Sequence, residues 1–354
     1  MKIFFLAGSD SIHSHKWINY FANMGYDIVW VSLVPATIKI LTNIDYYEFT
    51  SGIFSSIYKV RKLILKFNPD IVHIHYLGYY ALLGLFSGAK CIVSTPWGSD
   101  INIGKKSFFK RLILSRILKK SKLLTCDAYF MRDELKKFDA PYDKINIVNF
   151  GIDSEKFFKQ ERNLKFLDKF NISDELTIIS LRNFEPIYDI KTLIYAAKII
   201  LKEIPTVHFL LGGKGTLENE LKQMVQSLGI SNSVHFTGFI DNQLLPSLIN
   251  SSDIYVSTSL SDAGLASSTA EAMACEVPVV VSDTAENDKW IDDKVNGFLY
   301  PTKDHPQLAK ILINLIKDKT LREKVGKEGR NIIINKNDYK NEMNKMNDLY
   351  LKLL

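Results

Sequence analysis

Short runs of β-branched and other apolar residues alternate with helical patterns along the whole chain, and this alternation constrains the fold more than any other feature. Strands that alternate with helices of about 10 to 15 residues predict parallel sheets with crossover helices. Because the pattern occurs in both halves, the sequence predicts an α/β fold with two doubly wound domains. Ligands of such sheets bind outside the carboxyl ends of the strands, so the residues that follow each run are the informative ones. The runs are 2–6, 27–33, 70–75, 90–95, 122–126 and 144–149 in the first half, and 176–181, 206–211, 233–237, 253–258, 277–282 and 297–300 in the second.

The length of the chain supports this division. A chain of 354 residues is too long for one ordinary core and fits two domains of roughly 150 to 180 residues. Strand periodicity gives way to a charged stretch between residues 151 and 171, where we place the linker. The predicted domains are 1–160 and 161–336, and a helix at about 337–354 is expected to complete the first domain.

Composition excludes several classes of protein. Apolar residues make up 46% and charged residues 24%, which is typical of globular proteins and not of disordered or fibrous chains. The longest uncharged run, 74–89, is shorter than the roughly 20 residues of a membrane span, and the apolar start is too short for a signal-peptide core. Cys91, Cys126 and Cys275 lack the paired spacing of disulfide or zinc sites, which favours a reducing cytoplasm. The net charge of +6 is too modest to argue for nucleic acid.

Three anion-binding devices follow strands of the second half. Arg182 follows one strand, a glycine-rich turn with Lys214 spans 212–215, and a stretch of small residues leads into a helix that carries Glu271. Small residues let the backbone approach a ligand, and the free N–H groups at a helix start attract anions. The fold would gather the three at one edge, which predicts a diphosphate site.

Each device also has a plainer interpretation. Arg182 could form a surface ion pair, and 212–215 could be an ordinary turn. Residues 268–271 read Ser-Thr-Ala-Glu, a capping box in which Ser268 caps the helix and Glu271 reaches back. The three-glycine dinucleotide fingerprint and the Gly-Lys-Ser/Thr phosphate loop are absent, which argues against nicotinamide and P-loop chemistry. Because no His and acid residues cluster at metal-ligand spacing, we expect no metal.

Polar residues also follow strands of the first half. His13 and its neighbours come after the first strand, and Trp97-Gly98-Ser99-Asp100 comes after the strand at 90–95. Asp100 is predicted to hold an acceptor hydroxyl or take its proton. His73 and His75 are interpreted mainly as structural hydrogen-bonding residues. The first-half group is expected to face the phosphate edge across a cleft.

Several motifs resemble those of family-4 retaining glycosyltransferases of the GT-B fold. They appear in the family's order and span most of the chain: 69–75, 97–101, 149–153, 234–238, 259–280 and 296–301. The resemblance implies two Rossmann-like domains facing across a cleft and transfer of a sugar from a nucleoside diphosphate donor with retention at the anomeric carbon. It does not identify the sugar.

The resemblance also implies roles for individual residues. Glu271 matches the second glutamate of the family's Glu-seven-residues-Glu motif, which holds the donor ribose, and Arg182 matches the arginine that binds the diphosphate. Asp100 and His13 would position the acceptor or the sugar. The remaining expected donor contacts are Lys191, Gly213, Lys214, Gly238, Phe239, Ile240, Asp262, Gly264, Leu265, Ala266, Ser267 and Ser268, and the expected acceptor contacts are Asp10, His15 and Trp97.

Three departures from the family pattern affect the donor-sugar contacts. The first motif glutamate falls at Ala263, with Asp262 one residue earlier. The usual lysine falls at Ile187, so Lys191 or Lys214 would replace it. The histidine often found before Gly-Ser-Asp is Trp97.

These observations predict a cytoplasmic, metal-independent glycosyltransferase without a cofactor. Its partners would be a nucleotide-sugar donor and a glycan or lipid-linked glycan acceptor, and not nucleic acid. Two alternatives remain open: a sugar-nucleotide epimerase, and an inactive family member that binds glycans or assists assembly. The missing carboxylate at Ala263 favours the inactive member slightly.

A basic segment at 105–122 suggests one further partner. It contains no acidic residue, and Phe108 and Phe109 could insert into a bilayer, which predicts contact of the first domain with an anionic membrane surface. The apolar and basic faces of this segment are poorly segregated on a helical wheel. A core helix whose long basic side chains reach to its rim is therefore the alternative.

Overall fold

The computed structural model describes residues 1–50, 52–98, 100–101, 107–262 and 264–354. The chain forms two compact units: unit 1 comprises Met1–Gly151 and Lys340–Leu354, and unit 2 comprises Ile152–Tyr339. Residues 152–160 therefore belong to unit 2 and not, as predicted, to the N-terminal domain. The reason is local: Ile152 and Phe157 are buried in the core of unit 2, and Ile152 forms a parallel bridge with Asp338.

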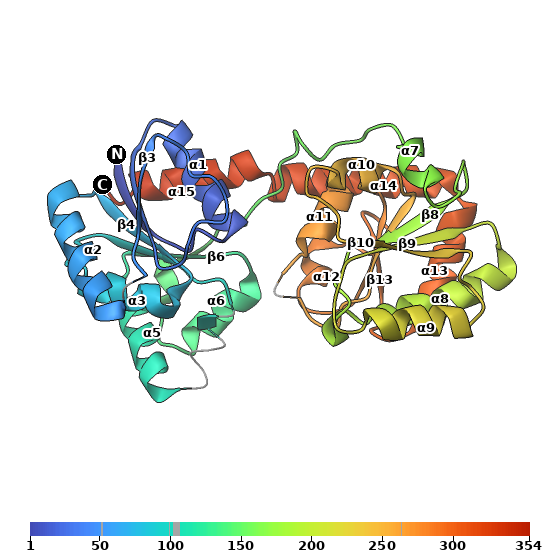
Figure 1. Cartoon of the computed structure of the whole chain (residues 1–354), viewed down its shortest axis with the longest axis horizontal. Coiled ribbons are helices and arrows are strands. Elements are labelled where there is room, and N and C mark those ends of the chain that lie inside the picture. Colours follow the sequence, from blue (N-terminus) through green and yellow to red (C-terminus); the bar gives the residue numbers. More distant parts are fainter. Residues whose placement is uncertain (51, 99, 102–106, 263) are drawn as a thin grey trace. The chain divides into compact units, whose positions relative to one another are not determined.

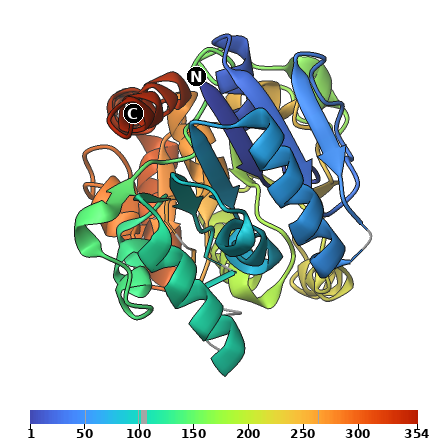
Figure 2. The same ribbon diagram turned by 90° about the vertical axis from the view of Figure 1, so that its left-hand side faces the viewer.

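Unit 1 is built on a seven-stranded sheet in the order β3-β2-β1-β4-β5-β6-β7, and every pairing is parallel. Figure 1 shows α2, α3 and α5 on one side of this sheet and α1 and α15 on the other, and Figure 2 views the same layers along the sheet. The elements are β1 (Lys2–Leu6), α1 (Ile12–Asn23), β2 (Asp27–Ser32), β3 (Ile44–Glu48), α2 (Ile53–Phe67), β4 (Ile71–His75), α3 (Leu77–Phe86), β5 (Ile92–Thr95), α5 (Phe108–Lys120), β6 (Leu123–Cys126), α6 (Tyr129–Lys136), η1 (Tyr142–Lys144), β7 (Ile145–Ile147) and α15 (Tyr339–Leu351).

Unit 2 has a six-stranded parallel sheet in the order β10-β9-β8-β11-β12-β13. The predicted α/β fold with two doubly wound domains is confirmed. The elements of unit 2 are α7 (Leu164–Asp168), β8 (Thr177–Ser180), η2 (Pro186–Tyr188), α8 (Ile190–Glu203), β9 (His208–Gly212), α9 (Glu218–Ser227), β10 (Val234–Gly238), α10 (Leu245–Asn250), β11 (Ile254–Ser257), α11 (Ser267–Ala274), β12 (Val279–Ser282), α12 (Asn287–Trp290), β13 (Phe298–Tyr300), α13 (His305–Lys317) and α14 (Lys319–Lys336).

Alternate residues of the strands build a core on each face of the unit 2 sheet. In β8, Ile178 belongs to one buried cluster and Ile179 to the other, and Phe209 and Leu210 of β9 divide in the same way. This alternation follows from the two-residue period of a strand. Because both faces are buried, the strands read as continuous apolar runs, which is why the sequence located them.

One strand, β3, was not predicted. The edge strand β3 has the sequence Ile-Asp-Tyr-Tyr-Glu, and only Ile44 is buried, so it lacks the apolar run of the central strands. The C-terminal helix predicted at about 337–354 is present as α15, which begins at Tyr339 after α14 has ended at Lys336. The chain breaks between them because the Asn337 carbonyl and the Tyr339 N–H pair with the backbone of Ile152.

Unit 2 depends on one close helix contact that gives a testable prediction. A Cβ atom at Gly326 of α14 would overlap the carbonyl oxygen of Glu276, which lies in the loop between α11 and β12. We expect Gly326→Ala to lower the free energy of unfolding by about 2 kcal/mol or more, because the helix must move away from a rigid backbone. Gly329→Ala on the same helix is the matched control. Its Cβ would lie 3.2 Å from the Asn296 oxygen, and the roughly 1 kcal/mol gain in helix propensity offsets that contact. Urea denaturation of both variants measures the difference, and equal stabilities would contradict the packing argument.

Candidate functional site

The three predicted anion-binding devices lie at the carboxyl ends of neighbouring strands. Arg182 follows β8, the turn 212–215 follows β9, and α11 follows β11. Strands β9, β8 and β11 are consecutive in the sheet, and all run in the same direction. We call this edge of unit 2, with Arg182, residues 212–215 and the start of α11, the donor edge, after the diphosphate donor that the sequence predicts to bind there.

Arg182 is held in one orientation by three groups. Its Nε donates a hydrogen bond to Ser259 Oγ at 3.0 Å, and its Nη2 pairs with the Asp262 carboxylate. The guanidinium also lies over the Tyr188 ring, with 4.4 Å from Cζ to the ring centroid. The side chain of Arg182 is only 10% exposed. The arginine is therefore a preorganised cation and not part of a flexible surface ion pair.

Asp262 forms an ion pair with Arg182. Burial raises the pKa of Asp262, and the Arg182 charge and the Ser259 hydroxyl oppose that rise. An ionised Asp262 beside Arg182 offsets the cost of burying each charge. Its carboxylate is engaged by Arg182, and Ala263, which falls at the motif position, lies outside the described residues.

The turn after β9 requires glycine. Gly213 has φ of 153°, and a Cβ there would lie 2.7 Å from the Arg182 carbonyl oxygen. The Phe184 N–H donates to the Lys214 carbonyl at 3.0 Å, and the Gly213 N–H donates to the Gly238 carbonyl at 3.1 Å. These bonds place Gly238, with exposed Phe239 and half-buried Ile240, beside the turn. The glycine turn is thus a constrained element that joins the ends of β8, β9 and β10.

The start of α11 is not a capping box. The helix begins at Ser267, and its N-cap residue, Ala266, makes no side-chain hydrogen bond. Ser268 lies inside the first turn, and its hydroxyl pairs with the buried Tyr255 hydroxyl at 2.7 Å. The capping-box interpretation is therefore wrong, because Ser268 is drawn inward by Tyr255. The first-turn N–H groups lack a side-chain cap among the described residues, and the half-buried Gly264 and Leu265 precede them. Glu271 is half-buried one turn further on.

The two candidate lysines differ in their surroundings. Lys191, at the start of α8, bonds to Glu220 of α9 at 2.5 Å, and this exposed partner raises the pKa of Lys191. Lys214 is exposed in the glycine turn itself. Of the two, Lys214 is better placed to meet an anion at the donor edge.

In unit 1, Asp100 has a structural role. It is 3% exposed, and its carboxylate accepts backbone hydrogen bonds from Leu77 at 2.7 Å and from Gly98 and Ile101 at 2.9 Å, with a further bond from Trp97. Burial raises the pKa of Asp100, and these backbone bonds oppose the rise. This geometry does not support the predicted catalytic role of Asp100, because its carboxylate oxygens accept the backbone hydrogen bonds that fix the start of α3 and the turn after β5. Ser99, which precedes it, lies outside the described residues.

Two other histidines of the first half, His73 and His15, are both buried. His73 is fully buried and bonds to Tyr350 Oη at 2.5 Å and Thr95 Oγ1 at 2.6 Å, so its structural interpretation is confirmed. His15 is also buried, and its Nε2 contacts the Ser9 carbonyl at 2.9 Å. The structure therefore does not expose His15 to an acceptor as predicted, because the ring is packed against Trp30. Asp10 is exposed.

His13, His75 and Trp97 form a polar aromatic cluster at the carboxyl edge of the unit 1 sheet. The rings of His13 and His75 each lie 5.9 Å from the Trp97 ring, and Phe150 lies 4.3 Å from His13. In the part of the chain that the structure describes, both ring nitrogens of His75, His13 Nδ1 and Trp97 Nε1 are buried without a hydrogen-bond partner. Buried polar atoms without partners are rare in proteins and point to a bound ligand or water. His75 was interpreted as structural, and its only sequence signal was its place as the last residue of a strand.

The two histidines of this cluster are neutral at neutral pH. Burial and the charge of Lys16 lower the pKa of His13 to about 4, and burial and the proximity of His13 lower the pKa of His75 to about 3. A neutral imidazole offers one donor and one acceptor, which suits the hydroxyl groups of a neutral ligand. Within the described ranges, no group of three or more His, Cys, Asp or Glu residues is arranged to hold a metal ion.

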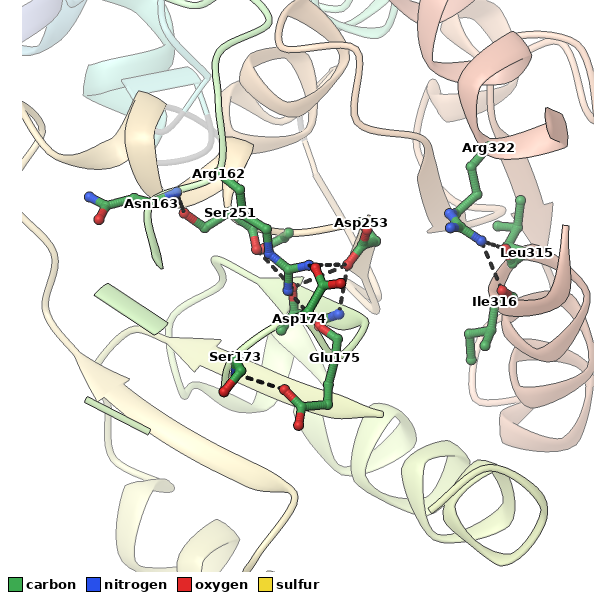
Figure 3. Close-up of polar contacts among 12 residues, drawn as sticks. Arg162, Asn163, Ser173, Asp174, Glu175, Ser251, Asp253, Leu315, Ile316 and Arg322 are labelled. Atoms are coloured by element: carbon green, nitrogen blue, oxygen red, sulfur yellow. Dashed lines mark hydrogen bonds and ion pairs between the residues drawn. The ribbon is translucent and has the colours of Figure 1, made fainter. Parts of the chain in front are cut away.

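A second charged region lies at the opposite, amino edge of the unit 2 sheet. It surrounds a cavity of about 230 Å³ that Arg162, Asp253 and Arg322 help to line. Figure 3 shows Arg162 directed at Asp253 and Asp174, and Arg322 at the Leu315 and Ile316 carbonyls, with bonds of 2.6 and 2.8 Å to these carbonyls. These cations fix neighbouring segments of the chain, so the cavity is less suited than the donor edge to bind an external anion.

The reassignment of Asp100 gives a testable prediction. Asp100→Asn keeps the shape of the side chain. Its single amide oxygen must then accept the backbone hydrogen bonds that the two carboxylate oxygens of Asp100 now accept. We expect the free energy of unfolding to fall by about 2 kcal/mol, because charge-assisted bonds to buried N–H groups are lost. The exposed Asp10→Asn is the matched control and is expected to change stability little. Thermal and urea denaturation test this, and an Asp100→Asn protein as stable as the wild type would refute the structural role.

Comparison with known proteins agrees with this geometry. Residues 163–332 match the family Glycosyl transferases group 1, and residues 2–128 match the family Glycosyl transferase 4-like. N-acetyl-alpha-D-glucosaminyl L-malate synthase of Bacillus anthracis is 26% identical over 329 residues, which cover 87% of this chain and 84% of the relative. UDP-Gal:alpha-D-GlcNAc-diphosphoundecaprenol alpha-1,3-galactosyltransferase of Escherichia coli is 24% identical over 84% of this chain and 79% of its own length.

A solved structure shows the same fold over the whole chain. Anabaena Alr3699/HepE, crystallised in complex with UDP, superposes with a TM-score of 0.85 at 18% identity, covering 100% of both chains. The two family matches together span most of both units, and the two parallel sheets fit them. The chain belongs to the family-4 glycosyltransferases of the GT-B fold.

Proposed function

We propose that this glycosyltransferase moves a sugar from a nucleoside diphosphate sugar to a glycan acceptor, with retention at the anomeric carbon. The observation that carries the proposal is the donor edge. There, three neighbouring strands are followed by a fixed arginine, a glycine turn and a helix start whose N-cap residue makes no side-chain hydrogen bond. Backbone N–H groups and a guanidinium together match the charge and shape of a diphosphate. We assign binding of the donor to unit 2 and binding of the acceptor to unit 1.

The donor is assigned to specific residues of unit 2. Arg182 and Lys214 bind the diphosphate, together with the N–H groups at the start of α11. Glu271 holds the ribose hydroxyls, and the base rests on residues 238–240. Exposed Phe239 beside Gly238 offers an apolar surface for a flat base, which supports this part of the assignment.

The chemistry requires no enzyme nucleophile. Arg182, Lys214 and the helix N–H groups stabilise the negative charge that develops on the leaving diphosphate. A diphosphate oxygen then accepts the proton of the attacking hydroxyl on the same face of the sugar, which gives retention. His13 and His75, both neutral at pH 7, position hydroxyl groups of the sugar or the acceptor through their buried nitrogens.

The acceptor is proposed to be lipid-linked. One relative bears a name that specifies a diphosphoundecaprenol-linked acceptor, while another makes an L-malate conjugate, so relatives use both lipid and soluble acceptors. In the described part of the chain, no helix is long and apolar enough to cross a membrane. We propose action in the cytoplasm, at the inner face of the membrane, in cell-surface polysaccharide or glycoconjugate synthesis.

A second candidate is an inactive family member that binds glycans. Ala263 favours it, because no carboxylate occupies that position and Asp262 is engaged by Arg182. Mass-spectrometric screening of purified protein with a panel of sugar nucleotides separates the two. Donor hydrolysis or transfer to an acceptor would exclude the inactive protein, and interconversion of sugar nucleotides without an acceptor would indicate an epimerase.

The donor assignment is tested by two substitutions. We expect Arg182→Ala and Glu271→Ala each to weaken binding of the matching nucleoside diphosphate by about 1.5 to 3 kcal/mol, because each removes charge-assisted hydrogen bonds to the ligand. The exposed Lys202→Ala on α8 is the control and should bind as the wild type does. Isothermal titration calorimetry measures the affinities, and wild-type affinity in both site variants would rule out the assignment.

Metal independence is tested separately. We expect transfer activity to survive excess EDTA, because fixed cations at the donor edge neutralise the diphosphate in the way that Mg²⁺ or Mn²⁺ would. Activity is measured with and without chelator on the same preparation, with thermal stability as a check on folding. Loss of activity with EDTA that Mn²⁺ restores would contradict this proposal.

A further inference from the structure

Arg182 and Asp262 form a largely buried ion pair at the donor edge of unit 2. Their side chains are 10% and 13% exposed, and Arg182 Nη2 donates to the Asp262 carboxylate. A guanidinium has five N–H donors, and bidentate binding of an anion uses two of them in parallel. Asp262 therefore occupies part of the group that is assigned to the diphosphate.

Two contacts besides Asp262 hold Arg182 in place. Its Nε donates to Ser259 Oγ at 3.0 Å, and its Cζ lies 4.4 Å from the centroid of the Tyr188 ring. Within the part of the chain that the structure describes, Nη1 donates no hydrogen bond. The edge of the guanidinium formed by Nη1 and Nη2 is therefore the one at which a ligand can bind, and Asp262 already contacts one of these two nitrogens.

The segment that leads to Asp262 is held from both sides. The Leu260 N–H donates to the Ile187 carbonyl at 2.8 Å, and the Leu260 carbonyl accepts from Thr284 Oγ1 at 2.9 Å. Ile187 lies in η2, which follows β8, and Thr284 follows β12. The loop that carries Asp262 thus begins from a fixed point between two neighbouring loops of the donor edge.

The pair compensates a buried positive charge. Arginine stays protonated when it is buried, so Arg182 requires an anion beside it in the ligand-free protein. A diphosphate at Arg182 would supply the same compensation, and two anions at one nitrogen repel each other. Asp262 and a diphosphate are therefore alternative partners of one cation.

We propose that Asp262 is an internal competitor of the donor, which occupies Arg182 in the ligand-free protein and is displaced by the diphosphate. This proposal rests on the proposed function, because it takes Arg182 as the residue that binds the diphosphate. Every anion that binds the Nη1–Nη2 edge must first separate Arg182 from Asp262. Small anions that offer few charges and hydrogen bonds gain too little to remain bound, so Asp262 favours a diphosphate as the occupant of the site.

Displacement also changes the protonation of Asp262. Burial raises the pKa of Asp262, and in the pair the charge of Arg182 opposes that rise. A bound diphosphate neutralises the opposing charge and adds negative charge of its own, so the pKa of Asp262 rises further and the carboxylate takes up a proton. Tyr255, which interacts with both partners, stays neutral because burial raises the pKa of its hydroxyl.

The competition is tested by isothermal titration calorimetry with UDP, GDP, ADP and dTDP, of which the tightest ligand is used throughout. We expect Asp262→Asn to bind this ligand on the order of tenfold more tightly than the wild type does, because the amide leaves Arg182 without a competing anion. The same direction is expected for inorganic pyrophosphate, which carries a diphosphate without base or sugar.

Two further variants serve as controls. Asp283 is exposed after β12 at the same edge of the sheet, so Asp283→Asn removes one negative charge without altering the pair and should change the affinity little. Ser259→Ala removes the hydrogen bond to Arg182 Nε, so the arginine loses a restraint and binding should weaken. The effects of Ser259→Ala and Asp262→Asn are therefore opposite in sign.

Two measurements separate competition from a loss of fold. Asp262→Asn is expected to lower the melting temperature of the ligand-free protein, because the Arg182 charge loses its partner, and saturating ligand should raise that temperature more than in the wild type. Titration in buffers of different ionisation enthalpy measures the protons exchanged on binding. The wild type should take up more protons than Asp262→Asn.

Equal or weaker nucleotide binding by Asp262→Asn would overturn the proposal, and weaker binding would leave Asp262 with a positioning role alone. Arg182→Ala separates this result from failure of the donor site. If Arg182→Ala binds as the wild type does, the diphosphate assignment itself is refuted. If Arg182→Ala weakens binding and Asp262→Asn does not strengthen it, only the competition is refuted. No binding of any of the four nucleotides to the wild type or to Asp262→Asn would refute both.

Discussion

Every strand pairing in both sheets is parallel, and the rest of the structure depends on this constraint. Each chain segment between neighbouring strands must return from the carboxyl edge to the amino edge, so the loops that follow strands gather at one edge of each sheet. In unit 2 these loops bring Arg182, the glycine turn and α11 together from segments that are far apart in sequence. In unit 1 the same rule gathers His13, His75 and Trp97, and also the first turns of α2, α3 and α5.

The two edges of the unit 2 sheet use charge in different ways. At the amino edge, Arg162 donates to the Glu175 carbonyl and lies 3.8 Å from Asp253, while Arg322 donates to the last carbonyls of α13. These cations satisfy groups of the chain itself. At the carboxyl edge, the N-cap residue of α11 makes no side-chain hydrogen bond, and Gly213 lets its turn pass close to the Arg182 carbonyl oxygen. Arg182 is the intermediate case, because Asp262 holds it in place and an incoming diphosphate would compete for the same guanidinium.

Much of the fold could be predicted from the sequence, because a strand buried on both faces must be continuously apolar. Of the thirteen strands in the described residues, twelve were predicted from this pattern, whereas β3 was not, since most of its side chains are polar and exposed. The positions of Arg182 and the glycine turn also followed, because each comes directly after a strand. The capping box could not be judged from sequence. Whether Ser268 caps the helix depends on Tyr255 of β11, whose buried hydroxyl forms a hydrogen bond with the Ser268 hydroxyl.

Asp100 and His75 show why residue type alone does not identify a functional side chain. Both are buried polar residues at the carboxyl edge of the same sheet, and the sequence favoured the carboxylate. In the structure, backbone N–H groups surround Asp100, so its buried charge is compensated and its acceptors are in use. The imidazole of His75 has no such partner among the described residues, although an unpaired buried polar group costs about 1 to 3 kcal/mol. The unpaired nitrogens of His75, beside His13 and Trp97, therefore point to a bound ligand or water that supplies the missing hydrogen bonds.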